Sequence, residues 1–154
     1  MKKWAYFLLF LFLNFAALAL GGLFTKAGVA SDWYQDLNKA PWTPPGWVFG
    51  AAWTFLMLCY SVFLAFLFQN TERRTKLWAI YALQWILNVA WNPLFFALHL
   101  TQWAMFDLLA LFSMILFTFR FAHSMLLWQK LFLLPYALWI IVAMSLNSFV
   151  ILMN

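Results

Sequence analysis

Residues 46–69 read GWVFGAAWTFLMLCYSVFLAFLFQ, a stretch of 24 residues without one charged side chain. About 20 such residues in a helix cross the roughly 30 Å hydrocarbon core of a bilayer. Similar apolar runs cover approximately 4–24, 77–98, 102–122 and 131–153, and polar clusters separate them. The sequence therefore predicts an all-α integral membrane bundle of five transmembrane helices. Residues 1–154 would form a single domain with a partly structured loop, residues 25–45, between the first two helices.

The composition supports a chain surrounded by lipid. It is 68% hydrophobic and 23% aromatic, and only 8% of its residues are charged, against about 25% in soluble domains. A domain of this size keeps much of its surface exposed, so the lipid bilayer is the expected partner. The net charge of +5 comes from scattered Lys and Arg near the ends of the apolar runs, which argues against nucleic acid as a partner.

The basic residues also predict an orientation. Two of them, Lys26 and Lys39, fall on one side of the predicted bundle. The other side, which holds the N-terminus, carries Lys2, Lys3, Arg73, Arg74, Lys76, Arg120 and Lys130. Cytoplasmic loops are enriched in such residues, so we expect a cytoplasmic N-terminus and a C-terminus across the membrane. The start resembles a signal peptide ending near Ala17-Leu18-Ala19, but the apolar run continues to Phe24, and we expect a retained helix.

The third predicted helix carries amides at membrane depth. At about 100° per residue, Gln84, Asn88, Trp91 and Phe95 share one face, and Pro93 should kink the helix. Two interpretations stay open. The amides could form hydrogen bonds that only hold the helices together, or they could line a ligand site.

Other predicted helices carry comparable stripes, with small or aromatic residues on one side. The stripes are Asn14, Ala17 and Gly21 in the first helix, Gly46, Phe49, Trp53, Met57 and Tyr60 in the second, and Tyr136, Trp139, Ala143, Leu146 and Asn147 in the fifth. Their convergence predicts a cavity for a flat, largely apolar ligand. Asp107 is the one acid well inside a span, with either a structural hydrogen-bonding role or a functional one. No carboxylate pair or metal-ligand spacing accompanies it, so no catalytic residue, metal site or required cofactor is predicted.

Residues 32–46, DWYQDLNKAPWTPPG, contain three prolines and two tryptophans. Proline fixes the backbone, whereas an ordinary linker is more polar and flexible. We expect this stiff segment to fold over one end of the bundle as a lid.

Here the chain resembles the tryptophan-rich sensory protein family, also called the translocator protein or peripheral benzodiazepine receptor family. The family pattern W-Y-x-x-L-x-K-P-x-W-x-P-P appears as Trp33-Tyr34, Leu37, Lys39, Trp42 and Pro44-Pro45, with Ala40 in place of a proline. Further matches follow in order along nearly the whole chain: Trp53, QWILNVAWNPLFF at 84–96, Trp103 with Asp107, and PYALWIIVAMSLN at 135–147.

The resemblance implies five helices, a homodimer and a pocket near residues 25–45. The implied ligands are porphyrins such as protoporphyrin IX, and drug-like aromatic molecules of the isoquinoline and benzodiazepine type. Porphyrin would be a ligand and not a required cofactor. The matching positions assign the pocket to Tyr34, Pro44, Gly46, Trp53, Asn88, Trp91, Phe95, Trp103, Trp139, Ala143 and Leu146. The cholesterol-recognition segment of animal members has no counterpart, because residues 148–153 contain neither Tyr nor a basic residue.

Three functions remain open on these residues. The first is a receptor or transporter-like protein with a sensory or regulatory role in porphyrin handling. The second is a light-dependent porphyrin-degrading enzyme that uses Trp53 and Trp139 as oxidisable aromatics. The third is a structural membrane subunit whose polar stripes only join helices. The short, tail-free chain suggests a bacterial cell membrane.

Overall fold

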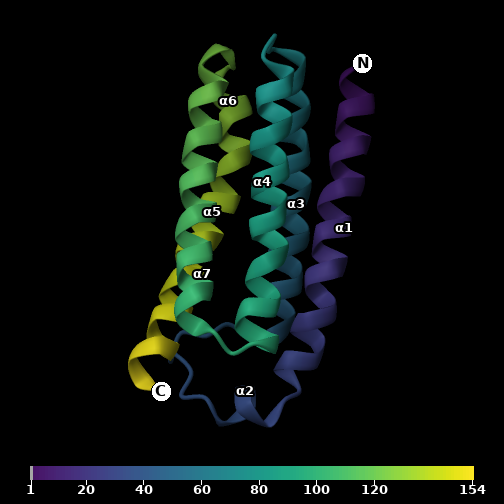
Figure 1. Cartoon of the computed structure of the whole chain (residues 1–154). Coiled ribbons are helices and arrows are strands. Elements are labelled where there is room, and N and C mark those ends of the chain that lie inside the picture. Colours follow the sequence, from purple (N-terminus) through teal and green to yellow (C-terminus); the bar gives the residue numbers. More distant parts are fainter. Residues whose placement is uncertain (1) are drawn as a thin grey trace.

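The computed structural model describes residues 2–154, which fold into helices joined by short turns (Figure 1). Five long helices lie side by side along the bundle. They are α1 (Lys3–Val29), α3 (Gly46–Gln69), α4 (Arg74–Asn92), α5 (Thr101–Phe121) and α7 (Leu134–Met153). The all-helical fold expected from the sequence is confirmed.

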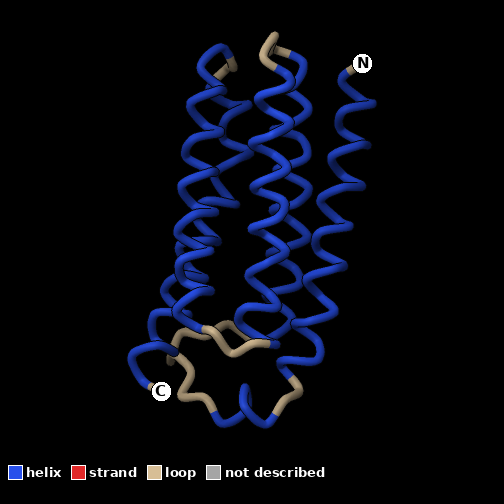
Figure 2. The backbone as a smooth tube through the Cα atoms, viewed as in Figure 1, coloured by secondary structure: helices blue, strands red, loops and turns tan. Residues whose placement is uncertain are grey.

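Short elements connect or extend these helices. The loop after α1 contains the short helix α2 (Asp32–Asp36), and α4 continues into a π-helical turn, η1 (Pro93–Ala97). The chain then passes from α5 through η2 (Ala122–Ser124), α6 (Leu127–Lys130) and η3 (Leu131–Leu133) into α7. Figure 2 shows that the loops gather at the two ends of the bundle.

The contacts between helices close the bundle into a ring in the order α1, α3, α7, α5 and α4, since α4 packs again on α1. The two ends of the chain lie at opposite ends of the bundle (Figure 1). The N-terminal end also holds α6 and the turn between α3 and α4, whereas α2 and the turn between η1 and α5 lie at the C-terminal end.

Within residues 2–154, four helical segments are long and apolar enough to cross a membrane: Lys3–Val29, Gly46–Gln69, Thr101–Ser124 and Leu127–Met153. Large apolar side chains also cover the outer surface, as Trp4, Phe12 and Leu152 are 74%, 73% and 80% exposed. In water such a surface would be costly, so the chain is an integral membrane protein. The predicted span 77–98 is not among the four; its helix α4 carries Gln84, Asn88 and Asn92.

Helix α1 extends to Val29, five residues beyond the predicted end at Phe24. Its last turns pack closely on α4 and η1. The Thr25 hydroxyl donates a hydrogen bond of 2.8 Å to Asn92 Oδ1. At Gly28 a Cβ atom would lie only 2.4 Å from Cβ of Phe96, so only glycine permits this approach. These contacts stabilise the last five residues of α1, which lie beyond its most apolar part.

Candidate functional site

The α2 segment, which we define as residues 30–45, covers one end of the bundle (Figure 2). The Ser31 hydroxyl caps α2 by accepting a hydrogen bond of 3.3 Å from the Tyr34 backbone N–H. The Trp33 ring stacks on His99, with ring centroids 3.9 Å apart and planes within 12°. Trp33 also meets Phe95 edge-on at 5.6 Å. The segment therefore rests on η1 and on the turn that follows it, in agreement with the expected lid position.

The His99 contact was not predicted from the sequence. Its backbone has φ of 56°, the left-handed region that few non-glycine residues adopt. This conformation accompanies the turn between η1 and α5, where the ring meets Trp33. A single histidine in a short turn gives no sequence signal for such a stack.

The C-terminal end of α7 holds the other half of the α2 segment. Asn154 Oδ1 accepts a hydrogen bond of 2.9 Å from the Asn38 backbone N–H, and Asn154 Nδ2 donates one of 3.3 Å to the Asn38 carbonyl. The indole N–H of Trp42 donates to the Ser145 hydroxyl at 3.2 Å, and its ring meets Phe149 edge-on at 5.4 Å. The first half of the α2 segment thus packs on η1 and the turn that follows it, and the second half is bound to α7.

Tyr34 is half-buried on the inner side of this segment. Its ring lies 5.6 Å from that of Phe96, and the Lys39 ammonium lies 4.7 Å from the centroid of the Tyr34 ring. Burial raises the pKa of the Tyr34 hydroxyl above its ordinary value of 10.0. Tyr34 therefore remains a neutral phenol near neutral pH, able to donate a hydrogen bond.

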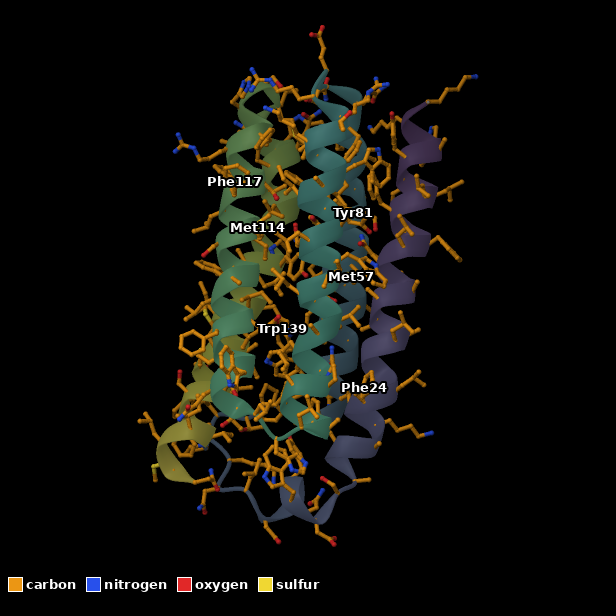
Figure 3. The ribbon with its side chains drawn as sticks, in the orientation of Figure 1. Phe24, Met57, Tyr81, Met114, Phe117 and Trp139 are labelled. Carbon is orange, nitrogen blue, oxygen red and sulfur yellow. The ribbon has the colours of Figure 1, made fainter. Side chains whose placement is uncertain are left out.

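Beneath the α2 segment the tryptophans of three helices face the interior. Trp91 of α4 stacks on Phe95 at 5.3 Å, Trp53 of α3 meets Tyr136 at 6.1 Å, and Trp139 of α7 meets Phe49 at 5.6 Å. All three tryptophans are partly buried and pack against the main core. Figure 3 shows Trp139 nearer the α2 end of the bundle than Met57 and Tyr81. The aromatic stripes predicted for α3 and α7 therefore meet, whereas Trp91 stacks on Phe95 of the turn that continues its own helix.

A buried hydrogen bond lies beside this aromatic group. Asn88 Nδ2 donates to the Tyr136 hydroxyl oxygen at 2.6 Å, joining α4 to α7. Further polar pairs follow along the interior: the Tyr60 hydroxyl donates to Gln84 Oε1 at 2.6 Å, and the Tyr81 hydroxyl donates to Asn14 Oδ1 at 2.9 Å. The amides of α4 thus form interhelical hydrogen bonds, the first of the two interpretations left open above.

Members of all four stripes, together with Tyr81 and Trp85, line a small cavity: Asn14, Ala17, Met57, Tyr60, Tyr81, Gln84, Trp85, Asn88 and Tyr136. The volume open to the centre of a water molecule is about 10 Å³. The cavity is far too small for the flat ligand that the stripes led us to expect at their convergence. The cavity therefore does not correspond to the predicted site for a large ligand.

The structure places the eleven assigned pocket residues unevenly. Asn88 and Phe95 are buried; Tyr34, Pro44, Trp53, Trp91, Trp139, Ala143 and Leu146 are half-buried. The remaining two, Gly46 and Trp103, are exposed. Trp103 is 63% exposed and lies next to Phe106 on the outer face of α5. Trp103 and Gly46 therefore do not join the interior aromatic group, and their part in binding stays a prediction.

Asp107 is buried within α5, at 8% exposure. Within the described range 2–154, its Oδ2 atom has no hydrogen-bond partner, and the same holds for the indole Nε1 of Trp91 and for Asn147 Oδ1. The structural hydrogen-bonding role considered for Asp107 is thus not observed at Oδ2.

The sequence analysis did not single out Ser61, Tyr81 or Phe96. Isolated hydroxyl groups and one more phenylalanine give no distinct pattern in so apolar a chain.

Comparison with known proteins agrees with this architecture. The sequence pattern of the TspO/MBR family matches residues 8–153. A tryptophan-rich protein TspO of Archaeoglobus fulgidus is 35% identical over 146 residues, which cover 90% of this chain and 92% of that protein. A tryptophan-rich sensory protein of Cereibacter sphaeroides is 31% identical, with 94% and 88% covered. A translocator protein of Bos taurus is 33% identical, with 83% and 78% covered. The chain therefore belongs to the TspO/MBR family of membrane proteins.

Proposed function

We propose that this protein binds tetrapyrroles of the protoporphyrin IX type, and aromatic molecules of the isoquinoline and benzodiazepine type, between the α2 segment and the Asn88–Tyr136 pair. Its role would be sensory or regulatory, in the handling of porphyrins. The observation that carries the proposal is that Trp53, Trp91 and Trp139, from three helices, all pack half-buried against the same core, and that the aromatic pairs of Trp53 and Trp139 join α3 to α7.

The chemistry of these side chains suits a flat aromatic ligand. Indole and phenol rings offer large apolar faces that stack on a macrocycle, and ligand sites combine such walls with a few polar groups. The buried Asn88 and the half-buried Tyr34 supply polar groups at opposite sides of the aromatic group. The names of the relatives, a sensory protein and a translocator protein, support a receptor-like role.

Access to this site would require the α2 segment to move. Trp33 packs edge-on against Phe95, and Tyr34 packs against Phe96. A macrocycle would have to separate these pairs, since their rings fill the space between α2 and η1. The α2 segment would then act as a lid that opens for the ligand and closes over it.

We also propose that α4 with η1 forms a fifth span. Its place in the closed ring and the opposite positions of the chain ends support an odd number of crossings. The basic residues favour a cytoplasmic N-terminus, in the cell membrane of a bacterium. A short tag at each terminus of the protein, tested for accessibility in intact cells, would check the number of spans. Five spans are contradicted if both tags lie on the same side of the membrane.

A second copy of the chain is the proposed partner of α4. Its outer face presents the small residues Ala79 and Ala82 beside Ile86, which is 57% exposed. Small residues let two helices approach closely in lipid. In a Cys59→Ser background, Ala82→Cys should form a cross-linked dimer in membranes, whereas Ser113→Cys on α5 should not. Monomer alone for both variants contradicts a dimer through α4.

The test of the binding site is a titration of protoporphyrin IX into the purified protein in detergent, in the dark, followed by tryptophan fluorescence. We expect saturable quenching that an isoquinoline drug reverses. Trp53→Ala and Trp139→Ala should weaken the affinity at least about tenfold, the equivalent of 1.4 kcal/mol. Trp4→Ala, which removes an exposed tryptophan at the opposite end, is the matched control and should bind normally.

The other outcomes decide against the site. Unchanged affinity in Trp53→Ala and Trp139→Ala would contradict the assigned pocket. Quenching that rises linearly, as with an unrelated membrane protein, would mean that porphyrin only partitions into the micelle. Loss of porphyrin absorbance in the light that depends on Trp53 would instead favour the degrading enzyme.

A further inference from the structure

The small cavity in the middle of the bundle has polar walls. Its lining includes three tyrosines, Tyr60, Tyr81 and Tyr136, and three amides, Asn14, Gln84 and Asn88. All six side chains are buried, and they come from α1, α3, α4 and α7. Met57 and Tyr81, which contribute to its walls, lie farther from α2 than Trp139 does (Figure 3). This cavity is thus separate from the proposed ligand site.

Two sets of hydrogen bonds approach the cavity. On one side the Tyr81 hydroxyl donates to Asn14 Oδ1, and Asn14 Nδ2 donates to the Ser61 hydroxyl at 2.9 Å. On the other side Asn88 donates to Tyr136. Gln84 lies on α4 between the residues that form these two sets, four residues from Asn88 and three from Tyr81.

Only one of the two polar atoms of the Gln84 side chain has a hydrogen-bond partner. Its Oε1 accepts a hydrogen bond of 2.6 Å from Tyr60, but within residues 2–154 its Nε2 has no partner. The side chain is 1% exposed. An unpaired buried donor costs about 1–3 kcal/mol, and lipid offers it no acceptor.

The orientation of the amide does not alter this imbalance. If the two ends of the Gln84 amide were exchanged, Nε2 would donate to the Tyr60 hydroxyl and Oε1 would be left without a donor. In either orientation one polar atom of Gln84 lies at the cavity without a protein partner.

We propose that this cavity is a binding site for one ordered water molecule, held by the Gln84 amide and the hydroxyls of Tyr81 and Tyr136. A buried water needs about 10–15 Å³ and two to four polar partners, and the cavity offers about 10 Å³. The water would join the Asn14–Ser61–Tyr81 set to the Asn88–Tyr136 pair. One polar network would then connect four of the five long helices at the centre of the bundle.

The water itself is the probe in the experiment. In the wild-type protein in detergent, nuclear Overhauser transfer from water to the Gln84 side-chain amide protons should reveal a long-lived contact. Ala17→Val fills the cavity beside Gln84 and should abolish this transfer while leaving the amide in place. Ala51→Val, on the exposed face of α3, is the matched control and should retain the transfer.

A crystal structure of the wild-type protein at high resolution gives an independent test that needs no variant. Density for a water within hydrogen-bonding distance of the Gln84 amide supports the site. The inference is overturned if the amide bonds directly to Tyr136 with no density between them, or if the wild-type amide shows no transfer from water. Equal transfer in Ala17→Val and wild type would also contradict a site in this cavity.

Discussion

The side-chain amide of Asn88 donates a hydrogen bond of 2.6 Å to the hydroxyl oxygen of Tyr136, and both residues are buried. This bond joins α4, the most polar of the long helices, to α7 across the interior. It also lies at a boundary, because both residues line the small polar cavity on one side, and Tyr136 meets Trp53 of the aromatic group on the other. The stability of the bundle and the floor of the proposed ligand site therefore depend on the same pair.

Tyr136→Phe should destabilise the protein by about 1 kcal/mol, because it removes the acceptor of the buried Asn88 amide. For a chain of this size that corresponds to a decrease in Tm of about 2–4 °C. Thermal unfolding in detergent, followed by tryptophan fluorescence, measures it. Tyr6→Phe is the matched control, because Tyr6 is a buried tyrosine whose ring is held by Phe10 and Phe68. Equal melting temperatures for the two variants would contradict the assigned role.

Gly28→Ala should destabilise the contact between α1 and η1 by about 1–3 kcal/mol, the usual cost of an overpacked site. The added Cβ would lie 2.4 Å from Cβ of Phe96, which cannot move without shifting its backbone. Gly22→Ala on the same helix is the control, since its Cβ meets nothing within 4 Å. There the higher helix propensity of alanine should raise stability by up to about 1 kcal/mol. The same thermal measurement compares the two, and a Gly28→Ala protein as stable as Gly22→Ala would contradict the close packing.

The sequence predicted α3, α5 and α7 well because each is one long, largely apolar run. The segment 46–69 coincides with α3, and the runs 102–122 and 131–153 lie within a few residues of α5 and α7. The kink expected at Pro93 corresponds to a change from α-helix to the π-helical turn η1. Proline has no N–H to continue the ladder, and a wider turn restores hydrogen bonding beyond it, as in the bond of 2.9 Å from Leu98 N–H to the Pro93 carbonyl.

Features set by tertiary contact were not predictable in this way. The last five residues of α1 are helical beside Asn92 and Phe96, which are distant in sequence. The resemblance assigned Trp103 to the pocket, but helical spacing alone does not say which face of α5 meets lipid, and this tryptophan is mostly exposed. The size of the central cavity was missed since hydrogen bonds between tyrosines and amides draw the stripes together.

Asn154→Ala should loosen the attachment of the α2 segment, because it removes the bonds to the Asn38 backbone N–H and carbonyl. Each such bond contributes about 0.5–1.5 kcal/mol, so hydrogen exchange at the Asn38 amide should accelerate by up to about tenfold per bond lost. Mass spectrometry of residues 30–45 measures the exchange. Asn70→Ala is the control: its side chain bonds the Phe66 carbonyl at 2.8 Å at the other end of the bundle. If both variants leave residues 30–45 unchanged, this attachment does not hold the segment.

The packing of Tyr34 should weaken at high pH. Burial raises the pKa of Tyr34 above 10.0, so the packed state favours the neutral phenol and the released segment favours the tyrosinate. Below pH 10.0 both states keep the proton and the contribution to stability is complete; as the pH rises through the pKa of the packed state, it is lost. The difference in tyrosinate absorbance between wild type and Tyr34→Phe isolates this titration, and we expect its midpoint above 10.0. A midpoint at or below 10.0 would mean that Tyr34 is in water and that α2 does not pack on Phe96 in solution.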